Sequence, residues 1–244
     1  MSYCFVIPNY NHTVLLAQLI ANLAKHNLPI IMVNDASCQQ ARAIFHALAE
    51  QYSCLSVIDH LENQGKGGAV QTGLSAAFTL GYSHAVQVDA DGQHDLNDVD
   101  KLIAESKKYP QALISGKPVY DQSIPKHRYY ARNITHFWVW VETLSFKIKD
   151  TMCGFRVYPL ASSVQLIQQT KLGKRMDFDI EVMVRLAWKN VELRFIDTKV
   201  AYPEHGVSHF RAFEDNMLIS WLHTRLFFGM LPRIPSLLLR KLTQ

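Results

Sequence analysis

The stretch CFVIPNYNHTVLLAQLIANLAKHNLPIIMVND, residues 4–35, decides the fold of this chain. Its two apolar runs, residues 4–8 and 29–35, have the length and β-branched content of buried strands. The segment between them, residues 13–25, has the apolar spacing of an amphipathic helix. Strand, helix and strand in this order form a parallel pair whose crossover is the helix. The stretch therefore predicts the first unit of an α/β sheet.

The same alternation continues through the first half of the chain. Thr13 and Asn97 stand where two of the expected helices begin and are residue types that cap helix N-termini. Repeated units of this kind predict a mostly parallel sheet with helices on both faces, which binds ligands at the carboxyl ends of its strands. The further expected strands are residues 55–59, 85–89 and 112–116, and the further helices are residues 39–51, 68–80 and 97–108.

The second half of the chain is less regular. Residues 117–132 are polar and basic and precede an aromatic helix at residues 137–146, while a helix at 177–188 precedes a strand-like run at 191–202. No internal repeat or Pro/Gly/Ser-rich linker divides the chain. We therefore expect one α/β domain, residues 1–215, and an amphipathic helical C-terminal extension, residues 216–244.

Composition narrows the class of protein. Of 244 residues, 48% are hydrophobic and 19% charged, which excludes a disordered chain, and a net charge of +4 does not favour a nucleic-acid binder. The four cysteines show no metal-binding or disulfide pattern and suit a reducing cytoplasm. Because the first residues lack a signal-peptide pattern and no apolar run reaches membrane-spanning length, we expect a cytoplasmic protein.

An acidic motif follows the expected strand at residues 85–89. In VDADGQHD, residues 88–95, Asp89 and Asp91 are two residues apart at a strand end, and Gly92 permits a sharp turn. Two carboxylates in this arrangement reach the same hard cation, Mg²⁺ or Mn²⁺, which completes its shell with water and substrate phosphate. The alternative is a solvated acidic turn, because Asp and Gly are common turn residues.

Two more polar loops follow strands at the same expected edge of the sheet. In VNDAS, residues 33–37, Asp35 can hydrogen-bond a nucleoside, although Asp35 or Ser37 can equally cap the next helix. NQGKGG, residues 63–68, opens the following helix, where backbone N–H groups and the Lys66 side chain suit a phosphate. The alternative for this loop is a flexible turn without a ligand.

Several phosphate-binding folds are excluded by what these loops lack. In the glycine loop Lys66 is followed by Gly67 rather than by Ser or Thr, so the P-loop pattern is missing. The first strand–helix turn, residues 8–12, contains no glycine, so the dinucleotide fingerprint is missing too, as is the G-x-S-x-G motif. The remaining class is a parallel-sheet protein that binds a nucleoside diphosphate through a metal ion and backbone amides.

The loop motifs, taken in order, resemble those of family 2 glycosyltransferases, and in particular the branch similar to dolichyl-phosphate mannosyltransferase. The resemblance extends from about residue 4 to about residue 211. Any one motif is short, but six motifs in order at suitable spacing are specific. They are VIPNY (6–10), VNDAS (33–37), NQGKG (63–67), DADGQ (89–93), DTMCGFR (150–156) and FDIE (178–181).

The resemblance implies a GT-A fold with a Rossmann-like nucleotide-binding half, a UDP- or GDP-linked sugar donor, a divalent cation and inversion at the anomeric carbon. The chemistry agrees, because the departing nucleoside diphosphate gathers negative charge that a metal and nearby cations stabilise. His12 stands where relatives usually have an acidic residue, which affects the nucleoside contacts. By the resemblance, Pro8, Tyr10, Asp35, Lys66 and Asp89 contact the nucleotide sugar, and Asp89, Asp91 and Gln93 hold Mg²⁺ or Mn²⁺.

The acceptor decides which residues act in catalysis. An alcohol acceptor needs a general base, for which Asp179 and Asp150 are the candidates, whereas a lipid phosphate is already anionic and would be contacted by arginine. The candidate arginines are Arg128, Arg132 and Arg156. A structural ion pair between Asp150 and Arg156 is the simpler alternative. Asp179 and Glu181 are, in the same way, common residue types in the first turn of a helix.

The last dense polar cluster is HGVSHFR, residues 205–211. Relatives have a Gly-x-Ser here that closes over the diphosphate, so Ser208 and Arg211 are further candidate donor contacts. His205 and His209 are four residues apart, but the intervening glycine disfavours a helical zinc site.

The C-terminal extension, residues 216–244, has a composition of its own. It contains four basic residues and no acidic one, so the net charge of +4 belongs to this segment. Basic residues among aromatic and leucine residues, interrupted by Pro232 and Pro235, are typical of an interfacial anchor on an anionic membrane. The alternative is a helix that packs on its own domain or on a second subunit of a homodimer.

Together these observations predict a metal-dependent inverting glycosyltransferase at the cytoplasmic face of the membrane, acting on a lipid or lipid-linked acceptor of the polyprenyl-phosphate type. One alternative is a haloacid-dehalogenase-like phosphohydrolase, in which D-x-D-G also follows a strand. There the motif usually lies near the N-terminus, whereas here it follows the fourth expected strand. The other alternative is an inactive module that binds a nucleotide sugar.

Overall fold

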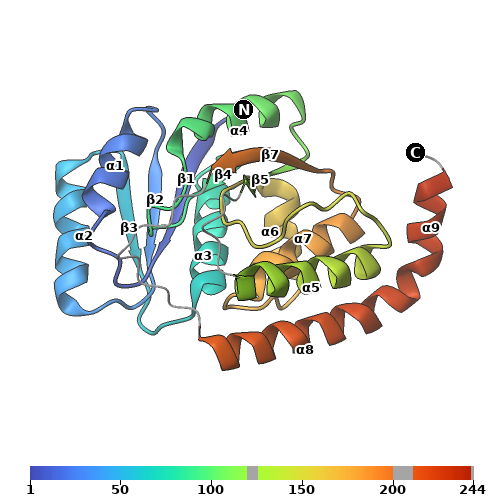
Figure 1. Cartoon of the computed structure of the whole chain (residues 1–244). Helices are drawn as coiled ribbons and strands as arrows, with labels where there is room; N and C mark the ends of the chain where they lie inside the picture. The colour runs from blue at the N-terminus through green and yellow to red at the C-terminus, as the bar shows by residue number, and fades with distance from the viewer. Residues whose placement is uncertain (120–125, 200–210, 243–244) are drawn as a thin grey trace.

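The order of the strands decides which loops meet at the edge of the sheet. The computed structural model describes residues 1–119, 126–199 and 211–242, with the backbone alone for residues 126–131, 212 and 241–242. Within these residues, seven strands form one sheet in the order β3-β2-β1-β4-β6-β5-β7 (Figure 1). They are β1 (Tyr3–Asn9), β2 (Ile30–Asn34), β3 (Leu55–Asp59), β4 (His84–Gln87), β5 (Leu113–Val119), β6 (Arg156–Pro159) and β7 (Leu193–Lys199).

Most neighbouring strands run parallel, and the predicted α/β class is confirmed. β1 is parallel to both of its neighbours, β2 and β4, while β2 is parallel to β3 and β5 to β7. β6 is the exception, because it runs antiparallel between β4 and β5. The sequence analysis did not anticipate β6, which has only four residues and leads directly into a helix.

Helices cover both faces of this sheet (Figure 1). Helices α1, α2 and α4 contribute to the hydrophobic core on one face, and α3, α6 and α7 to the core on the other. The helices are α1 (Leu16–Ala24), α2 (Gln39–Gln51), α3 (Lys66–Thr79), α4 (Val99–Lys108), α5 (Lys126–Thr143), α6 (Leu160–Gln169), α7 (Phe178–Trp188), α8 (Ala212–Met230) and α9 (Ile234–Leu242), with short 3-10 turns η1 (Leu96–Asp98) and η2 (Leu231–Arg233).

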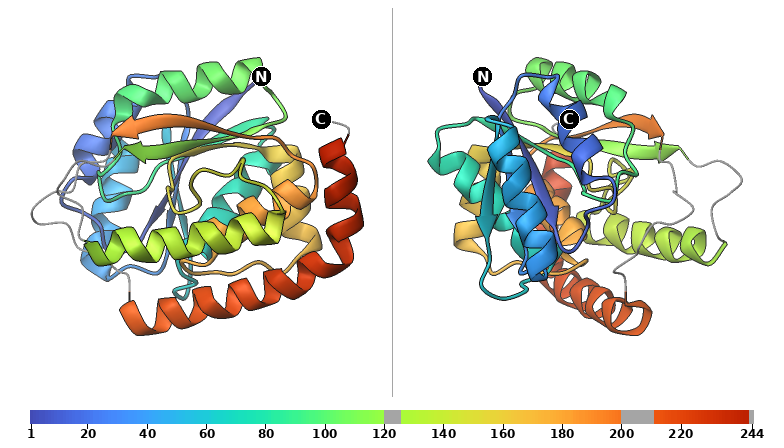
Figure 2. Two further views of the ribbon diagram at one scale, coloured as in Figure 1. Left: turned by 45° about the vertical axis from the view of Figure 1, so that its right-hand side comes forward. Right: turned by 90° about the vertical axis from the view of Figure 1, so that its left-hand side faces the viewer.

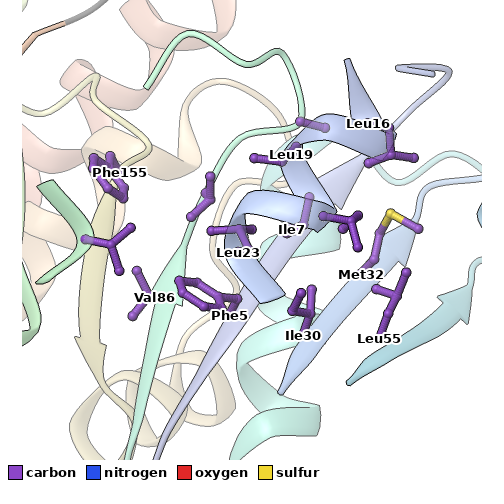
Figure 3. Close-up of a cluster of buried hydrophobic side chains, with 14 of the residues drawn as sticks. Phe5, Ile7, Leu16, Leu19, Leu23, Ile30, Met32, Leu55, Val86 and Phe155 are labelled. Atoms are coloured by element: carbon purple, nitrogen blue, oxygen red, sulfur yellow. The ribbon is translucent and has the colours of Figure 1, made fainter. Parts of the chain in front are cut away.

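Packing of α1 on the sheet fixes the carboxyl end of β1. Leu16, Leu19 and Leu23 lie on one face of the helix because they are three and four residues apart. They pack with Phe5 and Ile7 of β1 in the same core cluster (Figure 3). Each of these five side chains is at most 5% exposed. Burial on this scale stabilises the fold by roughly 1.5–3 kcal/mol per side chain.

Helices α5 and α8 lie side by side and form a further layer against α7 (Figure 2). Leu222 and Leu226 of α8 are buried in one core cluster with Val139 of α5 and Val184 of α7. One face of the C-terminal segment thus packs on its own domain, which agrees with one of the two sequence-based alternatives. Among the described residues, no helix combines the length and apolar character needed to cross a membrane.

Several helix starts differ from the expectation. α5 begins at Lys126, within the segment 117–132 that was expected to be a loop, rather than at residue 137. α1 begins at Leu16 rather than at Thr13, and no side chain caps it. Asn97 lies inside η1, whose cap is Asp95: its Oδ1 accepts the backbone N–H of Asn97 at 3.0 Å. The cause is local, since the carboxylate of Asp95 stands two residues ahead and reaches a backbone donor at the start of the turn that lacks a helical partner.

Candidate active site

The carboxyl ends of β1, β2 and β4 are neighbours, because these strands are parallel and adjacent in the sheet. Asp35 follows β2, and Asp89 follows β4. Lys66 begins α3, and Asp179 lies in the first turn of α7. Contacts among these side chains, given below, bring the predicted loops together at one edge of the sheet.

Asp35 holds the glycine loop in place. Its carboxylate is buried and accepts the backbone N–H groups of Gln64 at 2.8 Å and Gly65 at 2.7 Å, and Nδ1 of His60 lies 2.8 Å from it. These two N–H groups were expected to face a phosphate; the structure directs them at Asp35 instead, because a buried carboxylate requires donors. Gly65 has φ +88°, which glycine adopts without strain. Contact between Asp35 and a nucleoside stays a prediction.

Lys66 joins two carboxylates from different elements. Its Nζ donates to Oδ2 of Asp89 at 2.8 Å and lies 3.0 Å from Oδ2 of Asp179. Burial alone would lower the pKa of Lys66, but the charges of Asp179 and Asp89 outweigh burial and raise it. Burial alone would raise the pKa of Asp89, but Lys66 and His94 hold it far below its usual range. Lys66 and Asp89 are therefore both ionised at neutral pH.

The DADGQ loop presents the expected metal donors at this edge. Gly92 has φ +71°, in agreement with the predicted sharp turn, and Oδ1 of Asp91 accepts the backbone N–H of Gln93 at 3.0 Å. In the part of the chain that the structure describes, no three His, Cys, Asp or Glu side chains are grouped so that they could hold a metal. The oxygens of Asp89, Asp91 and Gln93 are nevertheless the hard donors that Mg²⁺ or Mn²⁺ accepts when phosphate and water complete its shell.

Two residues that the sequence analysis missed position Asp89. A Cβ at Gly154 would lie 2.3 Å from Oδ2 of Asp89, so the carboxylate fills the place where any other residue would carry its side chain. His94 stacks on Phe155, with ring centroids 5.0 Å apart, and its Nε2 lies 3.5 Å from the same oxygen. The sequence offers a signal for His94, which directly follows the predicted donors. It offers none for the close approach of Gly154 to Asp89.

Arg156 is fully buried on β6 and supports the start of α7. Its guanidinium donates to the carbonyl oxygens of Thr151 at 2.7 Å and Asp179 at 2.9 Å, and it lies 3.6 Å from Oδ1 of Asp179. Burial alone would lower the pKa of Arg156, but Tyr158 and Asp179 raise it. The structure thus places this predicted phosphate contact in the interior, next to Asp179, rather than on a surface.

Asp150 pairs with α5, which corrects the ion pair with Arg156 considered from the sequence. Nε of Arg132 donates to Oδ2 of Asp150 at 2.6 Å, and Nε2 of His136 lies 3.5 Å from that oxygen. The other carboxylate oxygen accepts two backbone N–H groups of the following loop. Burial alone would raise the pKa of Asp150, but His136 and Arg132 lower it. A carboxylate with this many donors is a poor proton acceptor.

The first two loops place their other residues as follows. Pro8 is buried within β1, and Tyr10, just after this strand, is 38% exposed. Oγ of Ser37 accepts the backbone N–H of Asn11 at 2.9 Å. The N-cap of α2 is Cys38, with no side-chain cap, so neither Asp35 nor Ser37 caps this helix as the alternative proposed. The two loops are instead hydrogen-bonded to each other.

Three predicted residues have little or no described contact with this cluster. Ser208 lies outside the described residues, as do His205 and His209. The backbone of Arg128 belongs to α5, but its side chain also lies outside the description. Nε of Arg211 pairs with Glu214 at 2.7 Å at the start of α8. Their contacts with donor or acceptor stay predictions.

Known proteins are similar in sequence to most of this chain. A family model described as Glycosyl transferase family 2 matches residues 4–172. A UDP-N-acetylglucosamine–dolichyl-phosphate N-acetylglucosaminyltransferase of Methanococcus voltae is 26% identical to this chain over 220 residues, which covers 83% of this chain and 87% of the relative. The predicted resemblance to this branch is confirmed.

Solved structures share the fold. Glucosyl-3-phosphoglycerate synthase from Mycobacterium tuberculosis has a TM-score of 0.67 at 12% identity, covering 94% of this chain and 79% of that one. Mannosyltransferase PcManGT from Pyrobaculum calidifontis, in complex with GDP-Man and Mn²⁺, has a TM-score of 0.59 at 17% identity, covering 95% and 64%. These likenesses show the fold, and the predicted GT-A type is confirmed.

Proposed function

The chain belongs to glycosyl transferase family 2 and is a glycosyltransferase, and from this premise we propose that it moves a sugar from a UDP- or GDP-linked donor to a lipid phosphate. The observation that carries the proposal is the largely buried cluster in which Lys66 pairs with Asp89 of the DADGQ loop and with Asp179. It combines a cation with carboxylates at the sheet edge where α/β proteins bind their ligands. Family membership excludes the phosphohydrolase alternative.

On the donor side of the reaction, the negative charge of the departing nucleoside diphosphate must be stabilised. As the sugar leaves, a nucleoside diphosphate with additional negative charge is released, and preorganised positive groups lower this barrier. Asp89, Asp91 and Gln93 would hold Mg²⁺ or Mn²⁺, which when bound supplies positive charge to the diphosphate. Lys66 supplies a further positive charge next to Asp89. These residues thus account for departure of the leaving group without any proton transfer.

The acceptor side needs a nucleophile. An oxygen of the acceptor phosphate attacks the anomeric carbon, and the bond from that carbon to the donor phosphate breaks, with its electron pair leaving on the diphosphate. Attack from the side opposite the leaving group inverts the configuration. Because the attacking phosphate is already anionic, no general base is needed. This agrees with the ion pair between Asp150 and Arg132, which makes Asp150 a poor proton acceptor. A relative's activity on dolichyl phosphate supports this acceptor class.

The outward face of α8 supports a membrane location for the acceptor. While its inward face is buried, the opposite face and the residue directly after the helix expose five large apolar side chains, here called the outward stripe. Residues 216–244 also carry four basic residues and no acidic one. Arg225, Arg233 and Arg240 contact the domain itself, so the apolar stripe carries the proposal that the enzyme lies peripherally at the cytoplasmic face of a membrane. The stripe comprises Phe213, Met217, Trp221, Phe228 and Leu231.

A thermal-shift experiment tests the donor proposal. Nucleotide sugars, UDP and GDP are added with and without Mn²⁺, and we expect one nucleotide series to raise the Tm only when the metal is present. Asp91→Ala should abolish this shift. Asp100→Ala, which removes an exposed carboxylate on α4, is the matched control and should keep it. Absence of a metal-dependent shift with every nucleotide would contradict the proposal.

A further inference from the structure

We propose that Lys66 is an exchangeable counter-ion: it neutralises Asp89 and Asp179 in the ligand-free enzyme and is transferred to the nucleoside diphosphate when a divalent cation takes its place at Asp89. The inference rests on the proposed function and adds to it an order of events. Strong metal binding then requires the nucleotide, because only the nucleotide offers the ammonium group a new partner.

The geometry of the ligand-free site carries this inference. The Nζ atom lies 2.8 Å from Asp89 and 3.0 Å from Asp179, so it bridges two carboxylates that come from different parts of the sheet edge. The side chains of Asp89 and Asp179 are only 16% and 6% exposed, so water cannot replace the lysine as their partner at low cost. Lys66 therefore occupies Oδ2, one of the two oxygens with which Asp89 would hold a metal ion.

The surroundings of Lys66 allow its ammonium group to move away while Asp179 keeps a positively charged partner. Asp179 keeps the guanidinium of Arg156, 3.6 Å from Oδ1, when Lys66 moves away. Lys66 itself is the first residue of α3, and its side chain is 20% exposed, so its long and flexible stem ends near the open edge of the site. Every charge thus has a partner before and after the exchange, which keeps the cost of the movement small.

A competing counter-ion has a measurable consequence. In the ligand-free enzyme a divalent cation must separate the ammonium group from Asp89 and then lies close to this positive charge, which keeps only Asp179 as its partner, so metal binding is weakened. With UDP or GDP present, the diphosphate accepts the ammonium group and the penalty disappears. Metal and nucleotide should therefore strengthen each other's binding, and by thermodynamic linkage each should do so by the same factor.

The test is the Kd of Mn²⁺, measured by electron paramagnetic resonance with and without UDP or GDP, on the full chain. For the wild type we expect the nucleotide to lower the Kd by about tenfold or more. For Lys66→Met we expect tighter Mn²⁺ binding than the wild type without nucleotide, and a nucleotide effect that is smaller than in the wild type because only the contact between metal and phosphate remains. The first result reports the removed competitor, and the second reports the lost exchange.

Lys174→Met is the matched control, because it removes one positive charge from the neighbouring segment. Nζ of Lys174 donates to Oε1 of Gln64 at 2.8 Å, and its backbone carbonyl accepts from Gly68. This variant should keep the Mn²⁺ affinity and the nucleotide effect of the wild type. Tighter Mn²⁺ binding in both variants would show a general charge effect and overturn the inference.

Two further outcomes separate this inference from the proposed function. Nucleotide binding with an unchanged Mn²⁺ affinity in Lys66→Met would overturn the counter-ion role and leave the glycosyltransferase proposal standing. Failure of both UDP and GDP to bind the wild type would contradict the donor proposal and the inference together. If Lys66→Met does not fold, the wild type still decides: Mn²⁺ binding that is equally tight with and without nucleotide overturns the exchange.

Discussion

The carboxyl edge of the sheet and the outward stripe of α8 differ in how much of their surface is already covered or neutralised within the chain. At the sheet edge, Asp89 and Asp179 share the ammonium group of Lys66 and are almost buried. On α8, Phe213 and Trp221 expose 79% and 60% of their surfaces. The first region has its charges neutralised within the chain, whereas the second leaves apolar surface to the solvent.

This difference indicates two different kinds of ligand. Internal ion pairs can be exchanged for charged ligands with little net change in desolvation, which suits a nucleoside diphosphate and a cation. Exposed apolar surface gains about 25 cal/mol per Å² when it is covered, which suits a lipid interface. We therefore expect substitutions at the sheet edge to affect stability and donor chemistry, and substitutions on the outward stripe to affect membrane association alone.

The largest effect on stability is expected at Arg156. Its replacement by Met removes the donor of two buried carbonyl oxygens and the guanidinium that lies 3.6 Å from the Asp179 carboxylate, so the free energy of unfolding should fall by about 3–5 kcal/mol. Urea denaturation measures this change. As a control, Lys117→Met breaks an exposed ion pair with Asp197 and should cost less than about 1 kcal/mol. Similar losses of unfolding free energy in the two variants would show that Arg156 does not support the site.

The two faces of α8 should respond differently to truncation. Leu222→Ala opens a cavity in the buried face and should cost about 2–5 kcal/mol of unfolding free energy. Trp221→Ala should change stability by less than about 0.5 kcal/mol but reduce co-sedimentation with anionic liposomes. Undiminished liposome binding together with a shift from dimer to monomer would assign the stripe to a second copy of the chain instead.

A methyl group at Gly154 should reduce activity through Asp89. The Cβ of Gly154→Ala would lie 2.3 Å from the carboxylate, which must move, and displacement of a catalytic group by about 1 Å can cost about 10²-fold in rate. We expect that loss in kcat/KM. Gly81→Ala, also a substitution at a glycine, is the control: its Cβ meets no atom within 4 Å, although φ is +84°, so it should cost stability but not activity. Equal activity in both variants would contradict the positioning of Asp89 by Gly154.

The smallest effect is a dependence on pH at Asp150. Because the pKa of this buried carboxyl lies below its usual value of 3.8, its contribution to stability is present above about pH 3.8 and is lost as the pH falls through the lowered pKa. Asp150→Asn should therefore cost about 1.5–3 kcal/mol at neutral pH. The gap between wild type and variant should narrow in acid. A gap that stays constant down to the acid limit of folding would show that the charge of Asp150 is not involved.

Local patterns predicted much of the fold. The first five strands and the helices between them follow from apolar runs and helical spacing, which act within a few residues. β6 escaped prediction because it has four residues and gains its stability from neighbours on both sides. That strand is inserted between β4 and β5, and this insertion brings Gly154 against Asp89. A contact of this kind depends on strand order and cannot be derived from spacing along the chain.

For the candidate site, too, the sequence predicted the residues of local motifs but not their contacts with distant segments. Asp89 and Asp91 were recognised by their motif, whose residues are neighbours in sequence. The partners of the charged groups were not predicted: Lys66 bridges to Asp179, and Asp150 pairs with Arg132. Ion pairs between distant segments depend on where the helices α5 and α7 pack, which is decided by the hydrophobic core rather than by the charged residues.

Transfer of labelled sugar from nucleotide sugar to lipid tests the central claim most directly. The protein is incubated with Mn²⁺, a radiolabelled UDP- or GDP-sugar and a short-chain polyprenyl phosphate in anionic vesicles, and the mixture is then partitioned between water and organic solvent. We predict that label enters the organic phase with the wild type and stays in water with Asp91→Ala. Label that remains in the aqueous phase with every nucleotide sugar, despite donor binding, would contradict transfer to a lipid phosphate.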